Sequence, residues 1–262
     1  MTEEILFGGV ANAGAVVRDG RHVLRPSNAH SASIHRFLAW LHEHGFNAAS
    51  IPVGIESDGR ERLLFIEGDV PVPPYAPWAQ HDDALASVAI LIRGLHVSAR
   101  SFDLRESSWS PEMADPAGGQ IMCHNDVCLE NVVFQQGIAV GLLDFDFAAP
   151  GRPVYDLAQF ARMCVPIDDD VNAARLGWLP ANLPARLRLV ADTYGLNADG
   201  RRELLDILDD SIMRGGAFVR RRVEAGDPNF IKMWNEMGGS TRFDRRRAWW
   251  AEYKQRFVDA LA

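Results

Sequence analysis

Two polar segments in the middle of the chain carry side chains that could perform chemistry. The first, CHNDVCLEN, contains Asp126 and ends at Asn131, and the second, LLDFD, contains Asp144. Phosphoryl transfer needs a carboxylate that orients the attacking hydroxyl and takes its proton, and hard oxygen ligands that hold Mg²⁺ against the β- and γ-phosphates. We therefore predict that Asp126 is the base and that Asn131 and Asp144 are magnesium ligands.

Short β-rich pieces surround these segments. The runs IMC, NVVF and IAVGLLDF are joined by polar loops and by a turn at Gln136-Gly137. We expect short strands that place the carboxylate and amide groups on the loops between them.

The N-terminal part of the chain has the pattern of a small antiparallel sheet covered by one helix. Strands are expected over residues 4–10, 14–18 and 21–25, with a hairpin turn at Asp19-Gly20. Apolar residues at helical spacing predict a helix that ends near Gly45. Two further strands are expected over residues 51–55 and 62–66.

A proline-rich stretch, residues 68–78, separates this unit from a mostly helical remainder. A helix that Asp82 or Asp83 could cap is expected to end near His96. Beyond Pro153 the pattern is helical to the end, where an apolar stripe predicts a packed terminal helix. The residues of this stripe are Trp250, Tyr253, Phe257 and Leu261.

The order of these features resembles the aminoglycoside phosphotransferase and choline kinase family, the small-molecule relatives of protein kinases. The catalytic loop of that family reads H-x-D-x-x-x-x-N, which HNDVCLEN matches, and LLDFD and PVYDLA follow in the family order. The resemblance covers nearly the first two-thirds of the chain. It implies an α+β, bilobal protein-kinase-like fold, with an antiparallel-sheet lobe over residues 1–68 and a larger helical lobe over residues 69–262.

The resemblance also implies roles for residues outside the two segments. ATP would lie between the lobes, and the backbone of Glu67, Gly68 and Asp69 would meet the adenine edge. His124 would be a scaffold residue and Asp156 a structural carboxylate that braces the catalytic loop.

Three features depart from the family pattern. Arg25 stands where the family often has a lysine that holds the α- and β-phosphates, and an arginine fork can still clamp phosphate. His35 stands near the position of the usual glutamate partner. The loop of residues 8–14 could cover phosphate, but Ala15-Val16 follow it, so it is not a Walker sequence.

These features predict an ATP- and Mg²⁺-dependent phosphotransferase that acts on an alcohol group of a small molecule, such as an antibiotic, an amino alcohol or a sugar-like compound. A catalytically silent relative that binds nucleotide or a small ligand is the alternative. Glu130 and Asp146 are candidate acceptor contacts, and with the acidic run at residues 168–170 they would favour a cationic acceptor. Asp146 could equally be a carboxylate that supports the ligating residues from behind, or a solvated loop residue.

Composition narrows the class of protein. The chain has 262 residues, of which 47% are hydrophobic, and its net charge of −8 disfavours nucleic-acid binding. The arginine runs at residues 220–222 and 245–247 are therefore interpreted as solvated helix faces. The start of the chain lacks the pattern of a secretory signal and no apolar run could span a bilayer, so a cytoplasmic protein with no membrane partner is expected.

The cysteines favour neither a disulfide scaffold nor structural zinc. Cys123, Cys128 and Cys164 are few and odd in number, which fits free thiols in a reducing compartment. Cys123, His124 and Cys128 lack a second Cys/His pair at zinc-ligand spacing. The sequence does not indicate which oligomeric state the protein has.

Overall fold

The computed structural model describes residues 4–6, 14–105, 107–213 and 216–262. Two expectations fall on residues outside these ranges. Of the expected strand at residues 4–10, Glu4–Ile5 is described, as strand β1. Of the glycine-containing loop, Gly14 is described, and residues 8–13 lie outside the described part of the chain.

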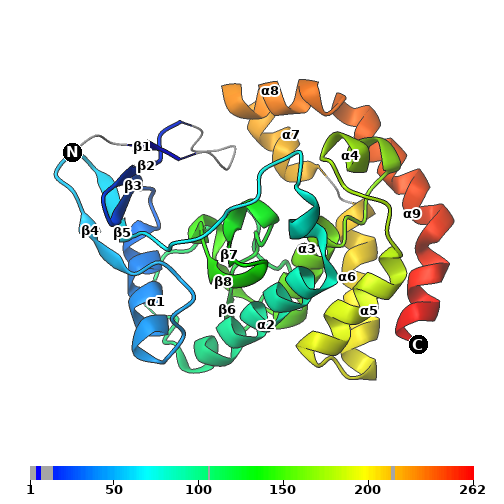
Figure 1. The fold of residues 1–262 in the computed structure, drawn as a ribbon, viewed down its shortest axis with the longest axis horizontal. Helices are drawn as coiled ribbons and strands as arrows, with labels where there is room; N and C mark the ends of the chain where they lie inside the picture. The colour runs from blue at the N-terminus through cyan, green and yellow to red at the C-terminus, as the bar shows by residue number, and fades with distance from the viewer. Residues whose placement is uncertain (1–3, 7–13, 106, 214–215) are drawn as a thin grey trace.

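A five-stranded antiparallel sheet forms one side of the molecule (Figure 1). Its strand order is β1-β2-β3-β5-β4. Asp19 pairs with His22 across a two-residue turn that contains Gly20, whose φ of 61° suits glycine. The strands beyond β1 are β2 (Val17–Asp19), β3 (His22–Pro26), β4 (Pro52–Ile55) and β5 (Arg60–Leu64).

Helix α1 (Ser31–Glu43) packs against this sheet. Its buried residues Ile34, Phe37, Leu38 and Leu41 follow the spacing of one helix face. Gly45, just after the helix, has a φ of 84°, which provides the left-handed conformation that ends a helix. The predicted covering helix is therefore confirmed.

Two short antiparallel strand pairs lie between the sheet and the helices. Strand β6 (Ile121–Cys123) pairs with β9 (Ala149–Gly151), and β7 (Val132–Gln135) pairs with β8 (Ile138–Leu142). The turn between β7 and β8 places both Gln136 and Gly137 at positive φ. Single bridges from Ala49 to Leu142 and from Asp69 to Phe134 attach the β7–β8 pair to the N-terminal part of the chain.

The remainder is mostly helical and encloses one apolar core. Trp250 is buried there and its indole N–H donates to Asp209 Oδ1 at 2.7 Å. Helix α2 begins at Asp82 after His81, so Asp82 and Asp83 lie in its first turn and do not cap it. The helices are α2 (Asp82–Ser98), α3 (Pro153–Cys164), α4 (Asp170–Arg175), α5 (Leu183–Tyr194), α6 (Ala198–Met213), α7 (Ala217–Glu224), α8 (Pro228–Glu236) and α9 (Gly239–Leu261).

The sheet with its helix and the helical remainder make up a bilobal α+β fold, as the sequence predicts. The boundary at residue 68 stays a prediction. Within the described ranges, no helix has both the length and the apolar character needed to cross a membrane.

Candidate active site

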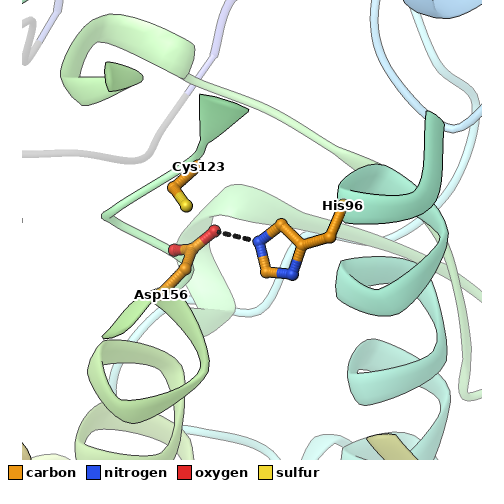
Figure 2. A group of neighbouring side chains, drawn as sticks. All are labelled: His96, Cys123 and Asp156. Atoms are coloured by element: carbon orange, nitrogen blue, oxygen red, sulfur yellow. Dashed lines mark hydrogen bonds and ion pairs between the residues drawn. The ribbon is translucent and has the colours of Figure 1, made fainter. Parts of the chain in front are cut away.

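The loop that follows β6 is held in place by one buried carboxylate. Asp156, in the first turn of α3, accepts hydrogen bonds from the backbone N–H groups of His124 at 2.8 Å and Asn125 at 2.7 Å. His96 Nε2 lies 2.9 Å from the same carboxylate (Figure 2). The other ring nitrogen, His96 Nδ1, lies 2.8 Å from the Tyr194 hydroxyl. Burial raises the pKa of Asp156, but the hydrogen bond and charge of His96 and the other donors bring it below its ordinary value.

This carboxylate belongs to the group His96, Cys123 and Asp156, the one cluster of potential metal ligands found among the described residues. All three side chains are buried, and the imidazole already has partners on both ring nitrogens. The group therefore has a structural explanation without a metal.

His124 joins this loop to the second polar segment. Its Nε2 lies 2.7 Å from the carbonyl oxygen of Leu143, directly before Asp144, and its Nδ1 accepts the backbone N–H of Asp126 at 3.3 Å. His124 is fully buried, and burial lowers its pKa, so the imidazole is neutral. The two segments are thus fixed relative to each other by a buried side chain.

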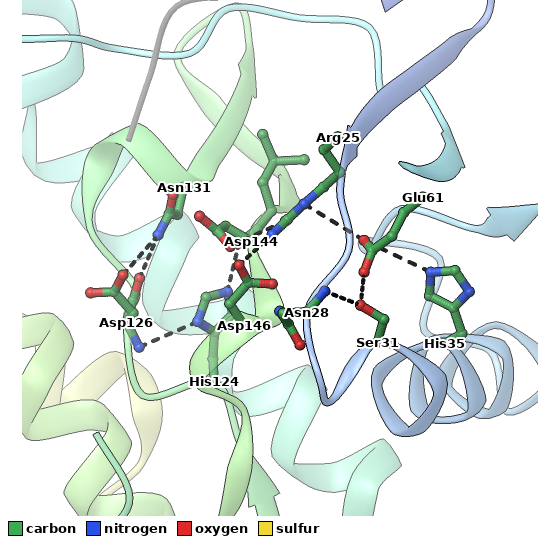
Figure 3. Close-up of polar contacts among 11 residues, drawn as sticks. Arg25, Asn28, Ser31, His35, Glu61, His124, Asp126, Asn131, Asp144 and Asp146 are labelled. Atoms are coloured by element: carbon green, nitrogen blue, oxygen red, sulfur yellow. Dashed lines mark hydrogen bonds and ion pairs between the residues drawn. The ribbon is translucent and has the colours of Figure 1, made fainter. Parts of the chain in front are cut away.

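Asp126 and Asn131 face each other across the loop (Figure 3). The Asn131 amide Nδ2 donates to the Asp126 carbonyl at 2.9 Å and to its carboxylate at 3.3 Å. These bonds fix the amide so that its oxygen is available as a ligand. Burial, followed by the negative charge of Asp144, raises the pKa of Asp126 to about 8.

Asp144 and Asp146 converge on one arginine of the sheet. Asp144 has a left-handed backbone, with φ 59° and ψ 68°, at the start of a short 3-10 helix over Phe145–Phe147. Arg25 Nη1 donates to Asp144 at 3.1 Å, and Nη2 donates to Asp146. Burial and the charge of Asp144 raise the pKa of Asp146 to about 6.

Glu61 is a site residue that the sequence analysis missed. It lies opposite Arg25 in the β3–β5 register, and its Oε2 is 3.6 Å from Arg25 Nε and 3.8 Å from His35 Nε2. Ser31 also donates to it (Figure 3). The sequence of β5 could have indicated this residue, because alternate residues of a strand face the same side. Glu61 lies two positions before Leu63 and is buried on the same face of the strand, where a carboxylate is unusual.

A cavity of about 300 Å³ lies between the sheet and the β7–β8 pair. Arg25, Asn131, Asp144 and Asp146 are at its polar end. Most of the remaining lining is apolar, which suits the flat faces of a purine. These apolar residues include Val16, Val23, Leu63, Phe65, Val133 and Leu142.

Of the predicted hinge residues, Gly68 alone lines this cavity. Its φ is 145°, and a side chain there would meet the Phe134 carbonyl oxygen at 2.5 Å. Asp69 exchanges both backbone hydrogen bonds with Phe134 at 2.8 Å, and the Glu67 carbonyl accepts from Gln135 Nε2 at 2.8 Å. Of the backbone groups that were expected at the adenine edge, the Glu67 carbonyl and both groups of Asp69 therefore already have protein partners.

The candidate acceptor contacts are also occupied. Glu130 accepts a hydrogen bond from the Tyr75 hydroxyl at 2.9 Å, and Asp146 pairs with Arg25.

The three cysteines are free thiols, and burial raises the pKa of each one. They are Cys123, Cys128 and Cys164.

Comparison with known proteins agrees with this arrangement. The sequence profile described as "Phosphotransferase enzyme family" matches residues 100–190, which contain Asp126, Asn131, Asp144 and Asp156. A trifolitoxin immunity protein of Rhizobium leguminosarum bv. trifolii is 30% identical over 274 residues, an alignment that covers 100% of both chains. The chain belongs to the same family as this immunity protein, and its residues 100–190 carry the phosphotransferase match.

Solved structures of small-molecule kinases share the fold of this family member. A choline/ethanolamine kinase family protein from Mesorhizobium loti has a TM-score of 0.66 at 16% identity, covering 100% of this chain and 92% of that one. An aminoglycoside 2'-phosphotransferase-IIIa bound to GDP has a TM-score of 0.58 at 14% identity, covering 95% and 93%. An ethanolamine kinase from Plasmodium vivax has a TM-score of 0.60 at 12% identity, covering 99% and 82%.

Proposed function

We propose that this protein transfers the γ-phosphoryl group of ATP to a hydroxyl of a small molecule. The observation that carries the proposal is the grouping of Asn131 and Asp144 at the polar end of one cavity, with Asp126 hydrogen-bonded to Asn131. An apolar cavity that ends in such a polar group fits a nucleotide whose base lies inside and whose phosphates reach the oxygen ligands.

The donor set fits magnesium. Asn131, Asp144 and Asp146 offer oxygen atoms, and Mg²⁺ prefers a few protein oxygens together with phosphate and water. When bound, the ion would offset the charge of the triphosphate. Arg25 pairs with both carboxylates and lines the same cavity, so its guanidinium is placed to share them with the metal and to contact phosphate.

Asp126 would orient the acceptor hydroxyl and accept its proton. Its side chain is fixed by Asn131, and positioning of this kind supplies much of the catalysis in phosphoryl transfer. Burial and then the negative charge of Asp144 disfavour ionisation of Asp126, so we expect positive charge brought by the metal to favour the carboxylate form.

The test is ADP release from ATP with a library of hydroxylated metabolites and antibiotics. We expect Asp126→Asn to lower kcat by about 10² to 10⁴-fold while nucleotide affinity is largely kept. Asp259→Asn, a substitution on the far end of α9, is the matched control and should leave both unchanged. Full turnover by the Asp126 variant would refute the assigned role.

A second candidate function has a specific observation in its favour. The relative that matches over its full length is named an immunity protein, and immunity can arise from binding a toxin without chemistry. A chain of that kind would bind nucleotide or a small ligand and release no ADP with any acceptor. Turnover by wild type that disappears in the Asp126 variant would exclude this candidate.

A further inference from the structure

Arg25 places one positive charge among three carboxylates of the candidate active site. Nη1 of its guanidinium donates to Asp144 Oδ1 at 3.1 Å, Nη2 donates to Asp146, and Nε lies 3.6 Å from Glu61 Oε2 (Figure 3). The residue is 8% exposed and lines the cavity. Each guanidinium nitrogen therefore faces a different negative charge in a largely enclosed place.

The acidic run that follows α3 is neutralised in another way. Asp168 pairs with Arg242 of α9 at 2.6 Å, and Asp169 pairs with Arg245 of α9 at 2.9 Å. Each of these two carboxylates thus has an arginine of its own. Contrary to the expectation from sequence, their charges are not free to attract a cationic acceptor.

Asp144 and Asp146 keep negative charge that Arg25 does not offset. Among the described residues, neither carboxylate forms an ion pair with any arginine, lysine or histidine other than Arg25. Because both bind nitrogens of one guanidinium, their oxygens lie close together and repel each other. A second cation at these oxygens would relieve that repulsion.

This second cation would meet the charge of Arg25 at close range. Mg²⁺ binds carboxylate oxygens at about 2.0–2.1 Å, and Arg25 is bonded to the same two carboxylates. Two cations on shared carboxylates repel each other strongly where the effective dielectric constant is well below that of water. Glu61 faces Arg25 in the β3–β5 register and limits how far the guanidinium can withdraw. The protein without nucleotide should therefore bind the metal weakly.

A triphosphate changes this balance. Its oxygens add negative charge at the polar end of the cavity, where Arg25, Asn131 and Asp144 lie. Among the described residues Arg25 Nε has no hydrogen-bond partner, and the fork has N–H groups beyond those bonded to carboxylates. Phosphate oxygens that accept from the fork reduce the repulsion between the two cations. Metal and nucleotide would then strengthen the binding of each other.

We propose that Arg25 makes metal binding depend on nucleotide, by lowering the affinity of Asp144 and Asp146 for Mg²⁺ until phosphate is present. Arg25 is then a positioning residue of the metal site as well as a phosphate contact. The inference rests on the proposed function, because it takes the cavity to be a nucleotide site.

The first test measures Mn²⁺ binding to the nucleotide-free protein by electron paramagnetic resonance, since Mn²⁺ takes the same oxygen ligands as Mg²⁺. The double variant Arg25→Gln/Glu61→Gln removes both members of a buried pair, so it keeps the net charge and leaves neither charge unpaired. We expect it to bind Mn²⁺ at least about tenfold more tightly than wild type. A merely structural role of Arg25 would weaken binding, so equal or weaker binding would refute the proposal.

Further variants locate the effect. Adding Asp144→Asn to the double variant should remove the gain in Mn²⁺ affinity, and a gain that persists would contradict the assigned site. The matched control is Arg62→Gln/Glu56→Gln, which removes an ion pair of β5 outside the cavity lining and should leave Mn²⁺ binding unchanged.

Arg25→Lys carries the test if the double variant does not fold. It keeps the charge beside Glu61, but one ammonium group cannot bridge two carboxylates as the fork does. We expect Mn²⁺ affinity to rise by about threefold for that reason. An affinity equal to or below that of wild type would refute the proposal.

The second test measures the coupling itself. Calorimetry gives the affinity for a non-hydrolysable ATP analogue with saturating Mg²⁺ and with EDTA. Because coupling between two ligands is reciprocal, we expect the factor by which Mg²⁺ strengthens nucleotide binding to be at least about tenfold smaller in the double variant than in wild type. An equal factor in both proteins would overturn the proposal.

This inference and the proposed function fail in different ways. Coupling that depends on Arg25, without ADP release for any acceptor, would refute the phosphotransferase and leave the role of Arg25 standing. ADP release that depends on Asp126, with unchanged Mn²⁺ affinity in the double variant, would refute this inference alone.

Discussion

The two halves of the candidate site are built in different ways. On the helical side, one buried carboxylate, Asp156, accepts hydrogen bonds from the backbone of the loop that holds Asp126, and it does not line the cavity. On the sheet side, Arg25 is held among Glu61, Asp144 and Asp146, so charged groups that would contact the ligand also hold the site together. Under the proposed function, residues on the helical side position the chemistry, whereas residues on the sheet side both hold the site together and contact the ligand.

The largest loss of stability is expected from a substitution on the sheet side of the site. Arg25→Met should destabilise the protein by about 3–5 kcal/mol, because it leaves the buried Glu61 without its cationic partner. Arg25→Lys, which keeps the charge but loses the fork, should cost less. Urea unfolding monitored by circular dichroism measures both variants. A Met variant as stable as wild type would show that the pair contributes nothing to folding.

A smaller effect is expected on the helical side. Asp156→Asn keeps the shape of the side chain but removes its charge and one acceptor, so a buried donor loses its partner. We expect a loss of about 3 kcal/mol in the free energy of unfolding. Asp206→Asn on α6 serves as a control for the same chemical change. If nucleotide affinity fell while stability was kept, Asp156 would have a role beyond bracing.

The smallest expected change in stability concerns Asp115, and it depends on pH. Asp115 lies next to Arg152, which precedes α3, and accepts from its Nε at 2.7 Å. Burial raises the pKa of Asp115, but the hydrogen bonds from Arg152 and Ala117 bring it below its ordinary value. Its stabilising contribution is therefore complete above the unfolded-state pKa of about 3.9 and is lost as pH falls through the lowered pKa.

We therefore expect Asp115→Asn to lower the free energy of unfolding by about 1–2 kcal/mol at pH 7. The difference in unfolding free energy between the variant and wild type should become smaller as the pH falls toward 3. Thermal unfolding of both proteins across this range gives the difference. A gap that widens in acid would contradict the sign of the shift.

Sequence reasoning was most successful where the chemistry is local. Asp126 and Asn131 are five residues apart on one loop, so spacing alone could predict their contact, and the hydrophobic period of α1 predicted its buried face. Glu61 could not be placed opposite Arg25 without the β3–β5 register, which depends on the length of the intervening segment.

The arginines of α9 show the same limit. A run of three arginines indicates a solvated face when only local composition is considered, but α9 packs against α5 and α6 and places Arg246 inside. Asp168 and Asp169 pair with residues of α9 more than 70 positions away in the chain. Such pairings follow from tertiary packing, which single-sequence patterns do not contain.

The partner of Arg25 comes from a neighbouring strand of the same ladder. In protein kinases the corresponding glutamate is on a helix, and movement of that helix makes or breaks the ion pair as a switch. Here Arg25 and Glu61 are opposed in a hydrogen-bonded register, so a shift of α1 would not separate them. The Arg25–Glu61 pair is therefore formed whenever the sheet is folded, whatever the position of α1.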